Sequence, residues 1–173
     1  MPIDDTTAFP WSAVCKLLVT TQQGSRYTCS GNLISPRHVL TAGHCVYFHD
    51  EGGWYQSITV VPGYDEGTAP FGSADAPDAV AYTAWIDSAD FRYDFAVLVL
   101  DRPIGNSAGW HGYAALTKPR RPRVTISGYP GDRDSGQVQY FASGRIRRAT
   151  TYELRYKIDT FGGQSGSGIF FTD

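Results

Sequence analysis

The chain has 173 residues, of which 42% are hydrophobic and 18% are charged, and its formal net charge is −2. This composition predicts a globular protein of one domain, or two small ones sharing a core, and excludes a disordered chain. The weak negative charge gives no bulk attraction to nucleic acid or anionic membranes. No apolar run reaches the roughly 20 residues of a membrane span, and the first residues do not resemble a signal peptide.

Short strands joined by glycine and proline turns are predicted along the first half of the chain. We expect strands at residues 13–20, 27–36, 57–64 and 94–100, and another in "HVLTAGHC" that breaks at Ala42-Gly43. The continuous apolar run "DFAVLVL" is typical of a strand buried on both sides. Residues 65–78 show no period and are expected to form a surface loop.

The second half continues this pattern after a boundary expected at residues 102–110. A strand is predicted at residues 123–132, and "QVQYFASGRIRR" and "YELRYKIDT" alternate with a period of two. No long amphipathic helix is evident, although "TAGHCVY" is long enough for one turn. Short, regularly spaced strands of this kind indicate an all-β sandwich or barrels.

Ser165 in "GGQSGSG" is the candidate nucleophile. A serine hydroxyl needs a neighbouring base, and acyl transfer also needs backbone N–H groups directed at the developing oxyanion. Gly163 allows its own N–H and that of Ser165 to point into one hollow, while Gly166 and Gly168 allow close approach of substrate. The alternative is an ordinary glycine turn, because Gly-Ser pairs are common in loops.

His44 in "TAGHC" is the candidate base, because it lies in a turn of small residues beside Cys45. Asp94 directly precedes "FAVLVL", where a carboxylate can accept the imidazole N–H and fix its tautomer. The other histidines and the nearby aspartates are expected to be surface, turn or structural residues: His38, His49, His111, Asp87, Asp90 and Asp101.

The three cysteines allow two interpretations. Cys29 and Cys45 are 16 residues apart, and a bridge between them would stabilise the fold by roughly 3 kcal/mol through loop closure. Two buried thiols in a cytosolic protein fit the sequence as well. Cys15 in "SAVCKLLV" is expected to be a small buried hydrophobic residue.

The order His44, Asp94, Ser165 is one of the chain orders found in serine hydrolases. The segments "CSGNLISPRHVLTAGHCV", "YDFAVLVL", "ISGYPGD" and "DTFGGQSGSG" resemble the chymotrypsin-like serine endopeptidases, and within them the bacterial glutamyl endopeptidase branch. "TTAFPWSAV" and "DRPIGNSAGWHGY" resemble the secreted Bacillus-type members. The resemblance runs from about Thr6 to Phe171.

The resemblance implies a role for each candidate residue. His44 would act as general base, Asp94 would orient it, Ser165 would form the acyl-enzyme, and the N–H groups of Gly163 and Ser165 would form the oxyanion hole. It also implies a Cys29–Cys45 disulfide, and therefore secretion, because disulfides persist in oxidising compartments. Thr160 would contact an acidic substrate side chain; a simple strand-end threonine is the alternative.

The implied fold consists of two six-stranded antiparallel Greek-key barrels. We expect residues 1–105 to form the barrel with His44 and Asp94, and residues 106–173 to form the barrel with Ser165, incomplete because its last strands are missing. The expected function is a secreted, monomeric endopeptidase that cleaves peptides after acidic residues, chiefly Glu. A chymotrypsin-like protease of other specificity and a catalytically silent binding module are the alternatives.

Other features predict less. No cofactor, metal, nucleic-acid or membrane partner is expected, and no His/Cys/Asp spacing indicates a zinc site. The basic runs "KPRRPR" at 118–123 and "RIRR" at 145–148 are interpreted as solvated. Two alternatives stay open: contact of the first run with acidic substrates or nucleic acid, and attraction of a glutamate by an arginine of the second run.

Overall fold

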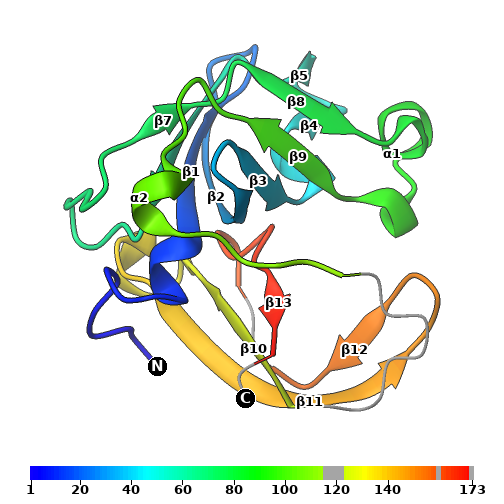
Figure 1. Cartoon of the computed structure of the whole chain (residues 1–173). Helices are drawn as coiled ribbons and strands as arrows, with labels where there is room; N and C mark the ends of the chain where they lie inside the picture. The colour runs from blue at the N-terminus through cyan, green and yellow to red at the C-terminus, as the bar shows by residue number, and fades with distance from the viewer. Residues whose placement is uncertain (115–122, 159–160, 172–173) are drawn as a thin grey trace.

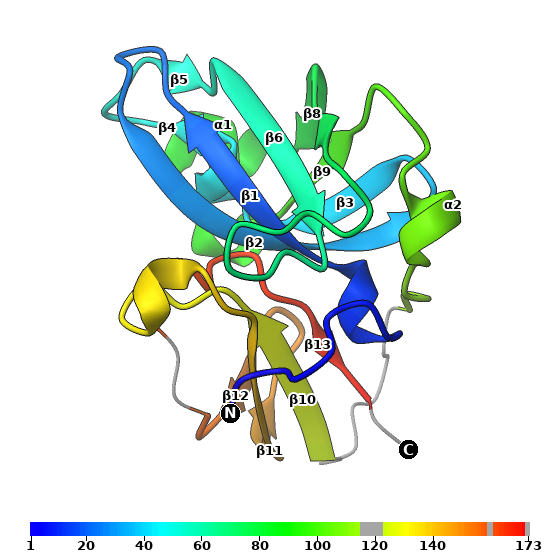
Figure 2. The same cartoon turned by 90° about the vertical axis from the view of Figure 1, so that its left-hand side faces the viewer.

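Two curled antiparallel sheets lie one above the other, the first built by the N-terminal part of the chain and the second by the C-terminal part (Figure 1, Figure 2). The computed structural model describes residues 1–114, 123–158 and 161–171. Strands dominate this part of the chain, which confirms the predicted all-β class.

The first sheet has seven strands in the spatial order β7-β6-β1-β2-β3-β9-β8. In chain order they are β1 (Val14–Thr20), β2 (Arg26–Ser35), β3 (His38–Thr41), β6 (Ser57–Pro62), β7 (Ala74–Asp75), β8 (Asp78–Ala81) and β9 (Ala96–Val99). A separate hairpin consists of β4 (Tyr47–Phe48) and β5 (Gly53–Trp54). All pairings are antiparallel, and Leu17 in β1 lies opposite Cys29 of β2 on one side and Val60 of β6 on the other.

The core of the first half lies inside this curled sheet. Alternate strand residues supply it because successive side chains point to opposite faces; fully buried members include Leu17, Leu33, Val39, Ile58 and Leu98. The prediction that the strand near residues 94–100 is buried on both sides was wrong. In β9 the side chains alternate between buried and half-buried, since only one face of this strand lies on the core.

The second sheet has four strands among the described residues, fewer than the six of a closed barrel that the resemblance implies. Their order is β12-β11-β10-β13, with bounds β10 (Arg123–Gly128), β11 (Tyr140–Ala149), β12 (Leu154–Tyr156) and β13 (Ile169–Phe170). The N-terminal residues run along this sheet, where Pro2 bridges Tyr140 (Figure 2).

The helical segments are short. They are α1 (Thr83–Ser88), α2 (Gly105–Ala108), and the 3-10 turns η1 (Trp11–Ala13), η2 (Gly43–Cys45), η3 (Phe91–Tyr93) and η4 (Asp134–Gly136). The turn η2 matches the prediction for "TAGHCVY", whereas β7 lies in the segment predicted as loop. No helix of the described part is long and apolar enough to span a membrane.

Candidate active site

Neighbouring strands bring His44 and Asp94 together. β3 and β9 pair antiparallel, with Thr41 opposite Ala96. The chain leaves β3 through extended Ala42 and turns at η2, which carries His44. On the neighbouring strand, Asp94 ends η3 just before β9 begins. The two residues therefore meet at the same end of adjacent strands, although they are 50 positions apart.

Two hydrogen bonds join this pair. The ring Nδ1 of His44 lies 2.7 Å from Oδ2 of Asp94, and the backbone N–H of His44 donates to Oδ1 at 2.8 Å. The Asp94 side chain is 16% exposed and the His44 side chain is 44% exposed. The carboxylate is thus sheltered while the imidazole remains open to a substrate.

The environment of Asp94 keeps its carboxylate ionised. Burial alone would raise its pKa, because a charged group is disfavoured away from water. The hydrogen bonds from the ring and backbone of His44, the attraction of its imidazole and a bond from the backbone of Gly43 outweigh this effect. The pKa of Asp94 therefore lies below its ordinary value of 3.8.

Trp85 on α1 forms a wall behind the pair and was not singled out from the sequence. Trp85 is 4% exposed, and its indole meets the imidazole of His44 edge to face, with ring centroids 6.4 Å apart. A Cβ on Gly43 would lie 2.9 Å from Trp85 Cδ1 and 3.0 Å from Asp94 Oδ1. Glycine is required at position 43 because the indole and the carboxylate fill the space that a side chain would occupy.

The loop that carries Ser165 is fixed to β2 of the first sheet. The carbonyl of Ser165 accepts a 2.8 Å hydrogen bond from the N–H of Ser30, and the Ser30 hydroxyl donates to the carbonyl of Gly163 at 2.8 Å. Ser30 Oγ also accepts from the N–H of Tyr129 at 3.0 Å. Ser30 was missed by the sequence analysis, because nothing distinguishes it from other polar strand residues.

The disulfide lies beside this loop. Cys29 and Cys45 are bonded, as the resemblance implied, and Cys45 Sγ lies 3.8 Å from the carbonyl oxygen of Ser165. Since Cys45 follows His44 directly, this contact positions the serine loop next to the histidine turn. The Ser165 hydroxyl makes no hydrogen bond to His44 within the described residues. Such bonds often tighten only when substrate binds.

The glycines of the loop allow it to approach other parts of the chain closely. Gly166 and Gly168 were expected to allow close approach of substrate, but a Cβ at these positions would instead meet Ser30 and Asn32 of the first sheet. Gly163 has φ +96°, and a Cβ there would lie 2.4 Å from the carbonyl oxygen of Tyr129. The N–H groups of Gly163 and Ser165 donate to no other described residue. Two free donors separated by one residue can serve a developing negative charge on a carbonyl oxygen.

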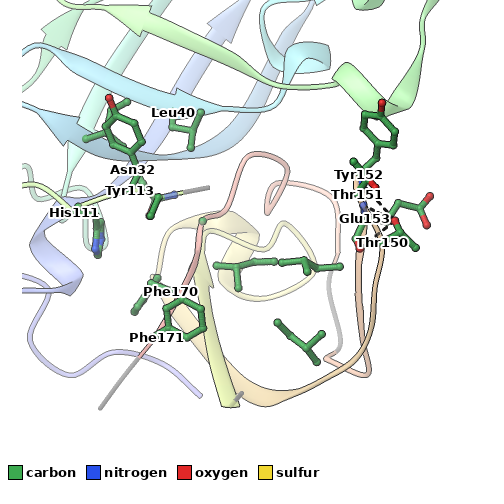
Figure 3. A pocket seen from close by; sticks show the side chains of 17 residues that line it. Asn32, Leu40, His111, Tyr113, Thr150, Thr151, Tyr152, Glu153, Phe170 and Phe171 are labelled. Atoms are coloured by element: carbon green, nitrogen blue, oxygen red, sulfur yellow. Dashed lines mark hydrogen bonds between the residues drawn. The ribbon is translucent and has the colours of Figure 1, made fainter. Parts of the chain in front are cut away.

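Two cavities differ in their relation to these residues. A cavity of about 260 Å³ is lined by Ser165 and its loop together with Ile126, Tyr156 and Phe161. A larger one of about 680 Å³ lies between the first sheet and the strands β12 and β13, with apolar residues such as Leu40 and Phe170 in its walls (Figure 3). The larger cavity contains none of the catalytic candidates, so the smaller one is the candidate substrate pocket. Thr160 lies outside the described residues.

The competing histidines have structural contacts, as expected. His38 Nδ1 lies 2.7 Å from the hydroxyl of Ser35. His49 donates from Nε2 to the carbonyl of Trp85 at 3.0 Å. His111 packs between the rings of Phe9 and Phe170, and burial lowers its pKa. None of the three contacts a second catalytic candidate.

The competing aspartates have other partners or none. Asp90 holds Arg92 in a bidentate ion pair, and Asp101 accepts a bond from the N–H of Asp75 at 3.1 Å. Asp87 is exposed on α1. Asp94 is thus the aspartate that the fold directs to a histidine.

A hydrogen-bonded histidine–aspartate pair beside a glycine-flanked serine, between two curled β sheets, defines a trypsin-like serine protease domain. The family model described as Trypsin matches residues 4–168, and the chain belongs to this family. The glutamyl endopeptidase of Bacillus licheniformis is 39% identical over 97% of this chain and 51% of its own length. A solved structure titled "Structure of Glu endopeptidase in complex with MPD" matches with a TM-score of 0.88 at 34% identity, over 98% of this chain and 78% of that chain.

A protein of Bacillus subtilis named "Extracellular metalloprotease" is 36% identical over 97% of this chain and 54% of its own length. The chain thus spans about half the length of the curated relatives it matches. Within the described ranges, no group of three His, Cys, Asp or Glu side chains is arranged to hold a metal ion.

Proposed function

We propose that this chain is the catalytic part of a secreted serine endopeptidase that cleaves peptide bonds after acidic residues, chiefly Glu. The observation that carries the proposal is the hydrogen bond of 2.7 Å between His44 Nδ1 and Asp94 Oδ2. It leaves the other ring nitrogen, Nε2, as the basic atom of the imidazole. The family match and the relatives named as glutamyl endopeptidases support the reaction and the specificity.

In the proposed reaction, Ser165 Oγ attacks the scissile carbonyl carbon while His44 Nε2 takes its proton. The carbonyl oxygen becomes an oxyanion and accepts hydrogen bonds from the N–H groups of Gly163 and Ser165. When the C–N bond breaks, His44 returns the proton to the leaving amine. Water then hydrolyses the acyl-enzyme through the same groups, and Asp94 stabilises the imidazolium in both halves.

The preference for Glu rests on the relatives and on Thr160, which is proposed to contact the acidic side chain of the substrate. The cavity beside Ser165, which Tyr156 and Phe161 help to line, has a volume of about 260 Å³, enough for a side chain of moderate size. Secretion is supported by the Cys29–Cys45 disulfide and by the relative named as extracellular.

A catalytically silent binding module is the second candidate, and one observation favours it. The Ser165 hydroxyl has no hydrogen bond to His44 among the described residues. In a silent module the serine loop would form part of a binding surface, and Ser165 would not act as a nucleophile.

Peptide cleavage separates these readings. The protein is incubated with three p-nitroanilide peptides that differ only in a final Glu, Lys or Phe, and nitroaniline release is followed. Release from the Glu peptide alone supports the proposed specificity. Release from the Lys or Phe peptide indicates a protease of other specificity. Absence of release from all three, in protein shown to be folded by its thermal transition, supports the silent module.

A further inference from the structure

Basic side chains gather on the second sheet, on the face that points away from its core. Six of them are exposed and form what is called here the basic face: Arg123, Arg145, Arg147, Arg148, Arg155 and Lys157. Residues 123–158 contain seven Lys or Arg and three Asp or Glu, whereas residues 1–114 contain five and twelve. The two parts of the chain therefore carry opposite net charges, although the net charge of the whole protein is only −2.

Strand register places arginines directly opposite one another on this face. Arg123 pairs with Arg145 across β10 and β11, and Arg148 pairs with Arg155 across β11 and β12. Like charges in opposed positions destabilise a sheet. Among the described residues, the basic face has one ion pair with an acidic side chain, between Arg155 and Glu153 at 3.0 Å. The repulsion is thus largely uncompensated within the molecule, and a bound anion would relieve it.

The basic face is continuous with the candidate substrate pocket. Tyr156 lines the cavity that contains Ser165. It is the last residue of β12, with Arg155 before it in the strand and Lys157 directly after the strand ends. Successive strand residues point to opposite faces, so Tyr156 faces inward while Arg155 faces outward. Lys157 is exposed. A polypeptide that leaves the pocket past β12 reaches these cations within a few residues. In Figure 1 the hairpin of β11 and β12 forms the outer rim of the second sheet.

We infer that the basic face is a docking surface for acidic stretches of polypeptide substrates, adjacent to the proposed cleavage site. The inference rests on the proposed function and narrows it to proteins in which the scissile residue lies near further Asp or Glu residues. Guanidinium groups suit this role because they bind carboxylates in a bidentate manner.

An acidic polypeptide fits this surface better than a nucleic acid does. Proteins that bind single strands combine cations with aromatic rings on which bases stack. On the outer face of β11 the aromatic side chain is Phe141, and it packs against Trp11, with ring centroids 5.2 Å apart. The acidic first half of the chain would also repel a long polyanion extending beyond the basic face.

The test uses two quenched fluorescent peptides with the same Glu cleavage site, one extended by aspartates and the other by the same number of serines. The variant Arg145→Gln with Arg148→Gln removes one member of each opposed pair. The control variant Arg26→Gln with Arg102→Gln removes the same charge from exposed positions of the first half. We expect the wild type to cleave the aspartate peptide about tenfold more efficiently than the serine peptide at low salt, through a lower KM.

This advantage should disappear in the basic-face variant and at about 0.5 M salt, and it should persist in the control variant. The melting temperature of the basic-face variant should equal or exceed that of the wild type, because the opposed charges are removed. Equal cleavage of both peptides after Glu at low salt would overturn the inference and leave the proposed function intact.

A binding measurement keeps the inference testable if neither peptide is cleaved. Fluorescence anisotropy of a labelled aspartate octapeptide is measured on Ser165→Ala protein with and without the basic-face substitutions, beside a labelled oligothymidylate. Loss of peptide affinity of about tenfold in the substituted protein supports the docking surface. Unchanged peptide affinity, or a loss confined to the oligonucleotide, overturns it.

Discussion

His44 and Asp94 are joined twice: the imidazole Nδ1 lies 2.7 Å from one carboxylate oxygen, and the backbone N–H of the same residue donates to the other at 2.8 Å. The two hydrogen bonds fix both the imidazole ring and the turn that carries it. A single carboxylate thereby determines the position, the orientation and the tautomer of the histidine.

Asp94→Asn should lower kcat on the Glu peptide by about 10⁴-fold with little change in KM, because an amide can donate to Nδ1 and stabilise the wrong tautomer. Steady-state kinetics on the Glu peptide measures the effect. Asp87→Asn is the matched control. Because Asp87 is exposed on α1, this variant should keep wild-type activity. An Asp94→Asn enzyme within tenfold of wild type would contradict the orienting role.

The lowered pKa of Asp94 makes its contribution to stability depend on pH. A carboxylate whose pKa is lower in the folded than in the unfolded protein stabilises the fold above its ordinary value of 3.8 and loses this effect as pH falls through the folded value. The unfolding free energy of wild type minus that of Asp94→Asn should therefore be constant from about pH 7 to about pH 5 and decrease at lower pH. Urea titrations across this range measure it, and a difference that grows on acidification would contradict the assignment.

Gly43→Ala should reduce kcat at least tenfold, because its Cβ would lie 2.9 Å from Trp85 and 3.0 Å from the carboxylate of Asp94. Relief of this overlap must move the indole or the carboxylate. Gly112→Ala is the control, as a Cβ at position 112 meets nothing within 4 Å. Kinetics and melting temperatures of both variants are compared. Equal kcat values for Gly43→Ala and Gly112→Ala would show that the site tolerates displacement of Trp85 or of the Asp94 carboxylate.

Ser30→Ala should weaken the serine loop without touching the proposed triad. The substitution removes the hydroxyl that donates to the Gly163 carbonyl and accepts from the Tyr129 N–H. Each buried group left without a partner costs about 1–3 kcal/mol. We expect a lower melting temperature together with slower acylation. Acylation at the wild-type rate in pre-steady-state assays would mean that Ser30 does not hold the oxyanion loop.

Cys15 should be inert in the folded protein. Its thiol is fully buried, and burial raises its pKa far above the ordinary value of 9.0, so that thiolate is scarce. A thiol-specific chromogenic reagent should detect no group in native protein and one group after denaturation, because Cys29 and Cys45 are bonded. Stoichiometric reaction of native protein would place the thiol at the surface.

Much of the fold could be predicted from the sequence because the signals are local. Period-two alternation and turn residues indicated β1, β2, β6, β10 and β11, and the small residues before His44 indicated the turn η2. The short α1 and α2 were not predicted, since six and four residues are too few to show a helical period. The half-exposed face of β9 was missed because Val97 and Val99 are apolar, although they lie outside the core.

The sequence indicated only those residues of the candidate site that lie in local motifs. His44, Asp94 and Ser165 stand in short motifs that local reading can find. Trp85 and Ser30 act through contacts between segments far apart in the chain, and nothing beside them in the sequence marks those contacts. The opposed arginines of the basic face likewise depend on strand register, which alternation alone does not reveal.

Covalent labelling of Ser165 tests the proposed triad most directly. Native protein is treated with a phosphonate ester that carries a Glu-like side chain, and the adduct is located by peptide mass spectrometry in wild type and in His44→Ala. We predict a single adduct on Ser165 in the wild type and a rate reduced by at least 10³-fold in the variant. An unlabelled Ser165 in folded wild-type protein, or labelling at the same rate without His44, would contradict the proposed mechanism.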